Sequence, residues 1–302
     1  FYWMGCGSAE GFITALDVSM EVSGKHNIAV GTWDWEEDGG VYDSANAKVW
    51  RFEAGSYWSA SWVDTSTYGT NWKASDLICD LKFSPNFDVD DTIVVLSVGD
   101  VVTTQDIGTY KGYYIQAGTW GNLKLWNAEG GYGSHPVLID YDSSCIVAPI
   151  DPQIGSGFDI GELARRSGHI ALPSDYMGDA SSGRRVMVAV NGLAVAPTTL
   201  MANVPGDELD EGGYLFWLEN TKVSLEMLEH EDNPYIASID YDGDKSMMGK
   251  TLVGLWGPKD WDYSDWFSYY FTGAGIDPAL PVCAGVQVLR SETTDVCCPR
   301  WD

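Results

Sequence analysis

Alternating apolar and polar positions recur along the chain in a pattern that appears four times, starting at Ile13, Ile78, Ile170 and Ile236. Each copy has an alternating apolar segment, an acidic or Ser/Pro/Asn turn, and a second segment rich in Val, Ile or Leu. Alternation with a period of two predicts a half-buried strand, and turn residues between two such segments predict a hairpin. Recurrence of such short strands indicates a β-propeller or a related array.

Each repeat predicts a group of four strands. In the first copy the expected strands are Ile13–Met20, Asn27–Trp33, Gly40–Asp43 and Lys48–Glu53. Long helical periodicity is scarce, so the chain is predicted to be all-β, a β-propeller-like array of about four four-stranded blades with loop insertions. We expect one domain over residues 1–302, with repeats at about 13–77, 78–169, 170–235 and 236–302.

The charge of the chain narrows the classes of partner. It has 302 residues with 44 acidic against 17 basic side chains and a formal net charge of −27. Contact with phosphates requires a basic footprint, so this charge argues against nucleic-acid binding. Two interpretations stay open: a solvated acidic surface, or an extracellular surface that divalent cations, chiefly calcium, partly neutralise.

The ends and the hydropathy of the chain bear on where it works. No stretch approaches the ~20 apolar residues that a membrane span needs, so no span is predicted. The chain begins at Phe1 without a recognisable secretion signal, which we interpret as a mature or partial chain. We expect an extracellular or cell-surface protein.

Six cysteines occur without C-x-x-C spacing, so the zinc and thioredoxin motifs are absent from the sequence. An even number in a predicted secreted protein favours disulfides, with the connectivity open. The adjacent Cys297 and Cys298 are expected to pair with different partners, because a bond between neighbours is strained. Cys79 lies in a predicted strand and could equally be a small buried apolar residue. The disulfide candidates are Cys6, Cys145, Cys283, Cys297 and Cys298.

The turn of the second repeat carries a recognisable motif in the segment SPNFDVDDTIVV. Its matching residues are Ser84, Pro85, Asn86, Phe87, Asp91, Thr92 and Ile93. The segment resembles the blade motif of secreted bacterial β-propellers related to the BNR/sialidase-like and WD40-like repeats. The other copies match it less well, and they keep Ser174, Asp175, Tyr176 and Asp179, then Asp240, Tyr241 and Asp244, and in the first copy Asp17 and Ser19.

The resemblance implies a structural turn and no catalytic activity. Propellers of this kind usually have six to eight blades, whereas the sequence shows four copies of the pattern. The chain is therefore a four-bladed propeller, an open array that closes with another subunit, or part of a longer protein.

Two acidic turns are candidate calcium sites. Asp240, Asp242 and Asp244 form D-x-D-x-D, the spacing of the first half of an EF-hand loop. The twelfth position, where that loop has a bidentate Glu, is Thr251. Asp and Gly are also expected at such a turn for backbone reasons, which is the alternative interpretation. The equivalent turn of the second repeat supplies Asp88, Asp90 and Asp91.

Aromatic residues stand beside carboxylates in two predicted loops. Aromatic rings beside acids can bind sugars, and paired carboxylates can hydrolyse glycosides; packing between blades or subunits is the alternative. The candidate sugar-binding residues are Trp33, Trp35, Trp261 and Trp266. The densest basic segments could dock an acidic face of a neighbouring copy, and they contain Arg165, Arg166, Arg184 and Arg185.

The sequence favours a structural function over a catalytic one. The four histidines are scattered, and Gly-x-Ser-x-Gly is absent. The leading hypothesis is a non-enzymatic subunit of an extracellular assembly, such as a surface layer, sheath, tube or filament. Copies of the chain would be its partners, and calcium would stabilise their contacts. The alternative is a secreted propeller that binds glycans or another ligand, and a glycoside hydrolase is the third hypothesis.

Overall fold

The structure is a computed structural model whose chain divides into two compact units. Unit 1 comprises Phe1–Ile139, Tyr176–Arg184 and Glu219–Thr221, and unit 2 comprises the remainder of the chain. The described residues are 11–34, 47–55, 61–101, 110–121, 124–127, 135–141, 145–148, 168–195, 211–226, 235–244, 249–256 and 269–272.

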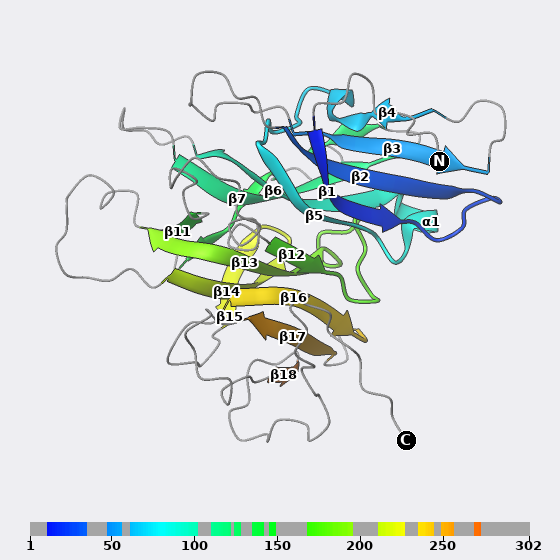
Figure 1. Cartoon of the computed structure of the whole chain (residues 1–302). Coiled ribbons are helices and arrows are strands. Elements are labelled where there is room, and N and C mark those ends of the chain that lie inside the picture. Colours follow the sequence, from blue (N-terminus) through cyan, green and yellow to red (C-terminus); the bar gives the residue numbers. More distant parts are fainter. Residues whose placement is uncertain are drawn as a thin grey trace, which may run out of the picture. The chain divides into compact units, whose positions relative to one another are not determined.

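Unit 1 contains a nine-stranded antiparallel sheet, which Figure 1 shows in blue to green. The strands β1 to β4 pair in sequence order, and β5 to β8 do the same, with β9 pairing to β7. Two short helical turns, η1 and α1, lie between strands. The bounds are β1 Gly11–Val18, β2 His26–Asp34, β3 Val49–Ala54, β4 Val63–Asp64, η1 Thr65–Thr67, β5 Leu77–Phe83, α1 Phe87–Asp90, β6 Thr92–Val101, β7 Tyr110–Thr119, β8 Leu125–Trp126 and β9 Val137–Leu138.

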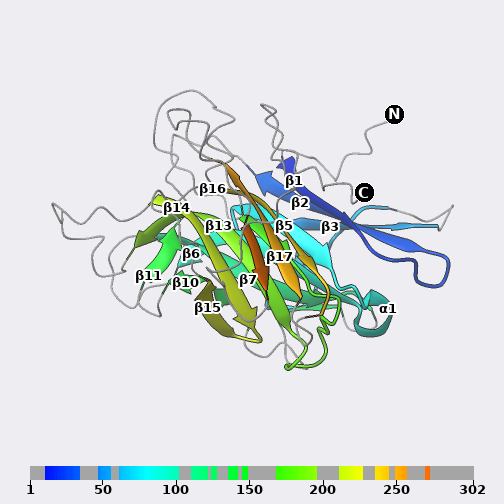
Figure 2. The same cartoon turned by 90° about the horizontal axis from the view of Figure 1, so that it is seen from below.

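Unit 2 contains a six-stranded and a three-stranded antiparallel sheet. The order of the larger sheet is β10-β11-β13-β14-β15, with β12 also paired to β13, and that of the smaller is β16-β17-β18. Figure 2 shows β13 beside β14 and β16 beside β17. The bounds are β10 Asp140–Tyr141, β11 Cys145–Ala148, β12 Gly168–Ala171, β13 Arg185–Val195, β14 Glu211–Glu219, β15 Lys222–Glu226, β16 Tyr235–Asp242, β17 Lys250–Trp256 and β18 Tyr269–Thr272.

The prediction of an all-β, propeller-like array of antiparallel blades is confirmed. Each copy of the sequence pattern opens a hairpin, namely β1–β2, β5–β6, β12–β13 and β16–β17. Further strands continue each hairpin into an antiparallel meander. The finer kinship with BNR-type or WD40-type blades, the repeat boundaries and secretion stay predictions.

Three of these hairpins share a β-bulge at the same position of the pattern. The register shifts between Ile13 and Ala15, between Ile78 and Asp80, and between Ile236 and Ser238. One extra residue therefore follows the first Ile of the pattern in each hairpin. A bulge bends its strand and increases the local twist, so the recurrence gives these hairpins a common shape.

The first two meanders of unit 1 meet closely at this bulge. A Cβ at Gly31 on β2 would lie 2.4 Å from Ile78 Cγ2, so only glycine allows β2 to approach β5 this closely. The bulge residue Thr14 donates its hydroxyl to the Ile78 carbonyl over 2.6 Å. The core of this unit is apolar and aromatic, and it includes Ile78, Leu81, Phe83, Phe87, Ile93, Val95, Trp120 and Trp126.

A buried polar side chain joins two strands of unit 2. Asn191, 1% exposed on β13, donates from Nδ2 to the Ile236 carbonyl over 2.8 Å. Its Oδ1 accepts the backbone N–H of Ile236 over 2.7 Å. Both backbone polar groups of Ile236 are thus satisfied beside the bulge of β16, above a core that includes Leu215, Trp217 and Val253.

Several expected elements differ from the structure. The strand Gly40–Asp43 lies outside the described residues, whereas β4, Val63–Asp64, is a strand that the pattern did not predict. The acidic turn of the second repeat forms the short helix α1, which ends at Asp91 in a left-handed conformation with φ 51°. None of the helices that the structure describes has the length and apolar character of a membrane-spanning helix.

Candidate functional site

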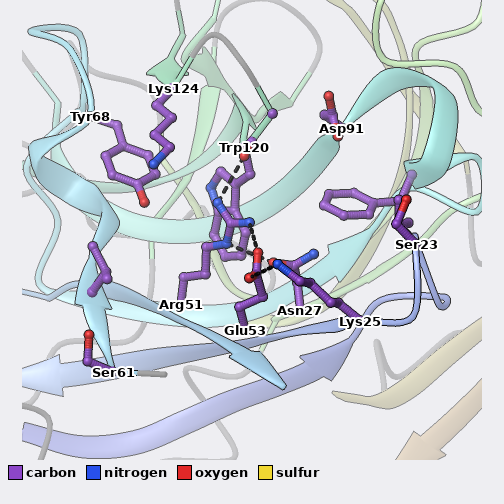
Figure 3. Close-up of a pocket in the computed structure, with 14 residues that line it drawn as sticks. Ser23, Lys25, Asn27, Arg51, Glu53, Ser61, Tyr68, Asp91, Trp120 and Lys124 are labelled. Carbon is purple, nitrogen blue, oxygen red and sulfur yellow. Dashed lines mark hydrogen bonds and ion pairs between the residues drawn. The ribbon is translucent and has the colours of Figure 1, made fainter. Parts of the chain in front are cut away.

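A cavity of about 500 Å³ opens in unit 1 and is lined mainly by polar side chains (Figure 3). Its walls come from the turn between β1 and β2, from β2 and β3, from β4 and the residues on either side of it, from α1 and the residue that follows it, and from the residues between β7 and β8. Its charged, amide and aromatic side chains include Lys25, Asn27, Arg51, Glu53, Tyr68, Asp91, Trp120 and Lys124. A volume of this size suits a small ligand.

Arg51 lies at the centre of the polar network (Figure 3). It projects from β3 and donates from Nε to Asn27 Oδ1 over 2.7 Å and from Nη1 to the Trp120 carbonyl over 2.9 Å. Its guanidinium carbon lies 5.5 Å from the centre of the Trp120 ring. The side chain is 14% exposed. These contacts fix the guanidinium at the cavity wall, since its planar N–H groups are held from two directions.

Glu53 shares the cavity face of β3 with Arg51 because residues two apart on a strand point to the same side. Its Oε1 lies 2.7 Å from Lys25 Nζ, and its Oε2 lies 3.5 Å from Arg51 Nη2. Lys25 follows a tight turn in which Gly24 has φ 77°. One carboxylate is therefore shared between two cations, at a site where about a third of the carboxylate side chain stays exposed.

Asp91 approaches the cavity from the end of α1. Its carbonyl accepts the backbone N–H of Trp120 over 2.8 Å, which ties the α1 turn to the end of β7. A Cβ at Gly121 would lie 1.8 Å from Asp91 Oδ2, so the carboxylate occupies the space that a glycine leaves open. Burial raises the pKa of Asp91, and the nearby Arg51 cation opposes that rise.

Lys124 lies over the ring of Tyr68, with Nζ 5.4 Å from the ring centre. Tyr68 follows η1 and is half-buried, whereas Lys124 is exposed. Among the residues that the structure describes, Lys124 forms no ion pair. A ring face attracts a cation without neutralising it, so this ammonium keeps its charge available to a ligand.

The aspartates in the acidic turn of the second repeat have contacts within the chain that the calcium hypothesis did not anticipate. Asp90 is buried, and its carboxylate accepts hydrogen bonds from Ser84 Oγ, from Thr92 N and from Gly178 N. Asp88 is exposed, and Asp91 lies at the cavity. Across the described part of the chain, no three His, Cys, Asp or Glu side chains gather as a metal site would require.

The acidic turn of the fourth repeat also has internal contacts. Asp240 accepts the backbone N–H of Tyr241 over 2.9 Å, and Asp244 accepts the hydroxyl of Ser174. Asp240 and Asp242 are exposed at the end of β16. Calcium binding at either turn stays a prediction.

The predicted aromatic and cysteine sites are described only in part. Trp33 is half-buried on β2, where it pairs with Phe12 and Leu77. Trp35, Trp261 and Trp266 lie outside the described residues, as do Cys6, Cys283, Cys297 and Cys298. Cys145 lies on β11, and Cys79 lies in the bulge of β5.

The arginines predicted to dock a neighbouring copy have partners within the chain where the structure describes them, and their docking role stays a prediction. Arg184 is buried and donates to the Gly178 carbonyl and to Asn220 Oδ1. Arg185 pairs with Asp175 at 3.3 Å. Arg165 and Arg166 lie outside the described residues.

No local spacing of residues in the sequence reveals the cavity. Lys25, Arg51 and Lys124 come from three separate segments, and each is isolated in the sequence. The available signal was their rarity, because the chain has 17 basic residues against 44 acidic ones. Because basic side chains are few in this acidic chain, each one is a candidate for a specific contact with an anionic group.

Comparison with known proteins gives distant structural neighbours. No protein-family model and no curated protein sequence matches the chain. The GH32 β-fructofuranosidase of Bombyx mori aligns with TM-score 0.36 and 12% identity over 87% of this chain and 48% of its own. A family 117 glycoside hydrolase of Zobellia galactanivorans aligns with TM-score 0.38 and 11% identity, over 88% of this chain and 68% of its own.

A β-fructofuranosidase variant of Microbacterium saccharophilum aligns with TM-score 0.31 and 11% identity, over 88% of this chain and 57% of its own. The chain thus spans about half to two thirds of the length of these proteins. All three are glycoside hydrolases, a finding that contradicts the sequence-based expectation of a non-enzymatic protein. That expectation is therefore wrong.

Proposed function

We propose that the cavity of unit 1 binds a saccharide. The observation that carries this proposal is a lining in which donors and acceptors alternate and are already held in place. Arg51 is fixed by Asn27 and by the Trp120 carbonyl, and Glu53 is fixed by Lys25. Every sugar hydroxyl both donates and accepts, so a lining of both kinds satisfies it. Side chains ordered before binding also reduce the entropy cost of association.

The same lining is less suited to a small ligand whose only polar groups are phosphates. A site for phosphate groups is built mainly from N–H donors and cations. Here Glu53 and Asp91 place two carboxylates beside the cations, and these accept hydrogen bonds from hydroxyl groups. This cavity therefore supports the glycan-binding hypothesis in preference to the structural-subunit hypothesis.

Hydrolysis of a glycosidic bond is a second candidate function, because two carboxylates with different surroundings line one cavity. Glu53 is held between two cations, Lys25 and Arg51. Burial raises the pKa of Asp91, which favours its protonated form. Glycoside hydrolysis uses one protonated and one ionised carboxyl group, and such divergent environments separate these two tasks.

Saccharide binding is tested by calorimetric titration of the full chain with a panel of oligosaccharides. Arg51→Lys keeps the charge but loses the planar fork, so we expect affinity to fall by about tenfold or more. Lys222→Arg, at an exposed position of β15, is the matched control and should bind as the wild type does. Equal saccharide affinity of Arg51→Lys and the wild type would show that the cavity is not the binding site.

Hydrolysis is tested on the same panel by following the release of reducing ends. Glu53→Gln and Asp91→Asn preserve shape and remove one carboxylate each, so either should reduce turnover by at least about a hundredfold. Turnover that survives both substitutions would reject this pair of residues as the catalytic carboxyl groups.

A further inference from the structure

We infer that the saccharide taken by this cavity is anionic and carries a carboxylate or a sulfate group beside Arg51 and Lys124. This inference rests on the proposed function, because it specifies the class of saccharide that the same site would bind.

The charge balance of the cavity is the reverse of that of the whole chain. Lys25, Arg51 and Lys124 face Glu53 and Asp91 there, so cations outnumber carboxylates. The chain as a whole has 17 basic and 44 acidic side chains. An anion approaching this protein is repelled over most of the surface, and the cavity provides a local attraction.

The charge of Arg51 is only partly neutralised inside the protein. Its close contacts, at 2.7 and 2.9 Å, go to the neutral oxygens of Asn27 and Trp120. The nearest carboxylate oxygen, on Glu53, lies 3.5 Å away, and the same carboxylate is engaged by Lys25 at 2.7 Å. Because these acceptors are neutral, they position the guanidinium without neutralising its charge. Much of that charge therefore stays available to an anion other than Glu53. A half-buried guanidinium binds a carboxylate or a sulfate more strongly than an exposed lysine does.

Lys124 supplies a second cation that no carboxylate of the described residues satisfies. Its ammonium lies 5.4 Å from the centre of the Tyr68 ring, and both residues line the cavity. Figure 3 shows Lys124 and Arg51 on the same side of the cavity as Tyr68 and Trp120. Two cations from separate segments of the chain therefore line one cavity, as recognition of a single anionic substituent requires.

The aromatic rings of the cavity are arranged for cations more than for sugar stacking. Arg51 covers Trp120 at 5.5 Å from the ring centre, and Trp120 is 1% exposed. Lys124 lies over Tyr68 in the same way. A neutral sugar would normally use such a ring face for its own C–H groups, whereas here cations occupy the faces.

Asp91 is the group that opposes an anion in this cavity. Burial raises the pKa of its carboxyl group, which weakens that opposition toward acidic pH. Its carboxylate lies against Gly121, next to Trp120. The remaining acid, Glu53, is already shared by two cations.

The test compares matched charged and uncharged ligands by calorimetric titration of the full chain. The carboxylate arm is tetragalacturonate against its methyl ester, and the sulfate arm is a sulfated galactan tetrasaccharide against its desulfated form. We expect at least one charged ligand to bind about tenfold more tightly than its uncharged partner. The arm that shows this difference identifies the anionic group.

Lys124→Gln should reduce that charged-to-uncharged ratio to about threefold or less, while the control Lys222→Gln leaves it unchanged. Uncharged ligands that bind as tightly as charged ones would overturn this inference and leave the proposed function standing. A ratio that Lys124→Gln does not alter would overturn the assignment of the anion to Lys124. If neither arm nor any neutral oligosaccharide bound, both the inference and the proposed function would fall.

Discussion

Gly178 donates its backbone N–H to the carboxylate of Asp90 over 2.7 Å, although the two residues are 88 positions apart in the sequence. The same carboxylate accepts from the Ser84 hydroxyl and from the backbone N–H of Thr92. Asn86 adds a further bond, from Nδ2 to the Tyr176 carbonyl over 2.8 Å. One aspartate of the repeat turn thus joins the α1 turn to a segment that enters unit 1 from much later in the chain.

This buried carboxylate makes the stability of the protein depend on pH. Burial raises the pKa of Asp90 above the ordinary value of about 3.9. Between that value and the raised pKa, the folded state binds more protons than the unfolded state, so the free energy of unfolding falls as the pH rises. The Asp90→Asn variant has no titratable group at this position, so its free energy of unfolding does not show this decrease.

Asp90→Asn also turns one acceptor into a donor, which leaves a buried N–H without a partner and costs about 1–3 kcal/mol. The stability gap between the wild type and Asp90→Asn should therefore narrow as the pH rises through the window. Urea unfolding of both proteins between about pH 3.5 and pH 7 measures it. Asp88→Asn, at an exposed position of the same short helix, is the control. A gap that widened with rising pH would contradict the raised pKa of Asp90 in the folded state.

Gly121→Ala should disturb the cavity while leaving the fold intact. The added Cβ would lie 1.8 Å from Asp91 Oδ2 and 2.4 Å from its Cγ, so the carboxylate must move. The obstacle is the end of a side chain, which can rotate, and we therefore expect a stability loss of about 1 kcal/mol. We expect saccharide affinity, measured by titration, to change by about threefold or more. Unaltered affinity in both Gly121→Ala and Asp91→Asn would place Asp91 outside the ligand contacts.

Gln116→Leu should destabilise unit 1 strongly because it breaks a buried polar network. The Gln116 amide is fully buried; it accepts from Lys73 N at 3.0 Å and from Asn127 Nδ2 at 2.9 Å. It donates to Ser97 Oγ at 3.0 Å and to the Lys73 carbonyl at 3.1 Å. Leucine leaves several of these groups unpartnered, and we expect a loss of about 3 kcal/mol. Thermal unfolding measures this loss, and Ser97→Ala, which removes one member of the network, should cost about 1 kcal/mol.

The hairpins were predictable because their information is local. The starting points Ile13, Ile78 and Ile236 coincide with the bulged ends of three hairpins, since alternation and turn residues specify a strand pair without reference to the rest of the chain. The candidate site was not predictable in this way. Arg51 acquires its partners Asn27 and Trp120 through contacts 24 and 69 positions apart, and no spacing in the sequence encodes them.

The aspartates of the turns are a second case in which spacing in the sequence does not determine the role of a residue. Asp90 was a reasonable calcium ligand by spacing, because carboxylates in an acidic turn supply the oxygens that calcium prefers. In the structure Asp90 is 6% exposed, and its oxygens accept backbone and hydroxyl donors. Whether a turn carboxylate faces inward or outward depends on what packs against it, and here that is the later segment around Gly178.

Asn191→Leu should destabilise unit 2 by about 3 kcal/mol, because it removes the partner of both backbone groups of Ile236. Asn191 is 1% exposed, and its bonds to Ile236 are 2.7 and 2.8 Å long. Leucine has the same branching and the same number of side-chain heavy atoms as asparagine, so no cavity forms and the loss reports the two unsatisfied polar groups. Hydrogen exchange of the Ile236 amide should accelerate in the variant, because that N–H loses its acceptor.

Asn191→Asp is the companion variant, since its carboxylate keeps the acceptor for the Ile236 N–H and loses only the donor to the carbonyl. Slower exchange in Asn191→Asp than in Asn191→Leu would confirm the assignment, and equal protection of this amide in Asn191→Leu and the wild type would reject it.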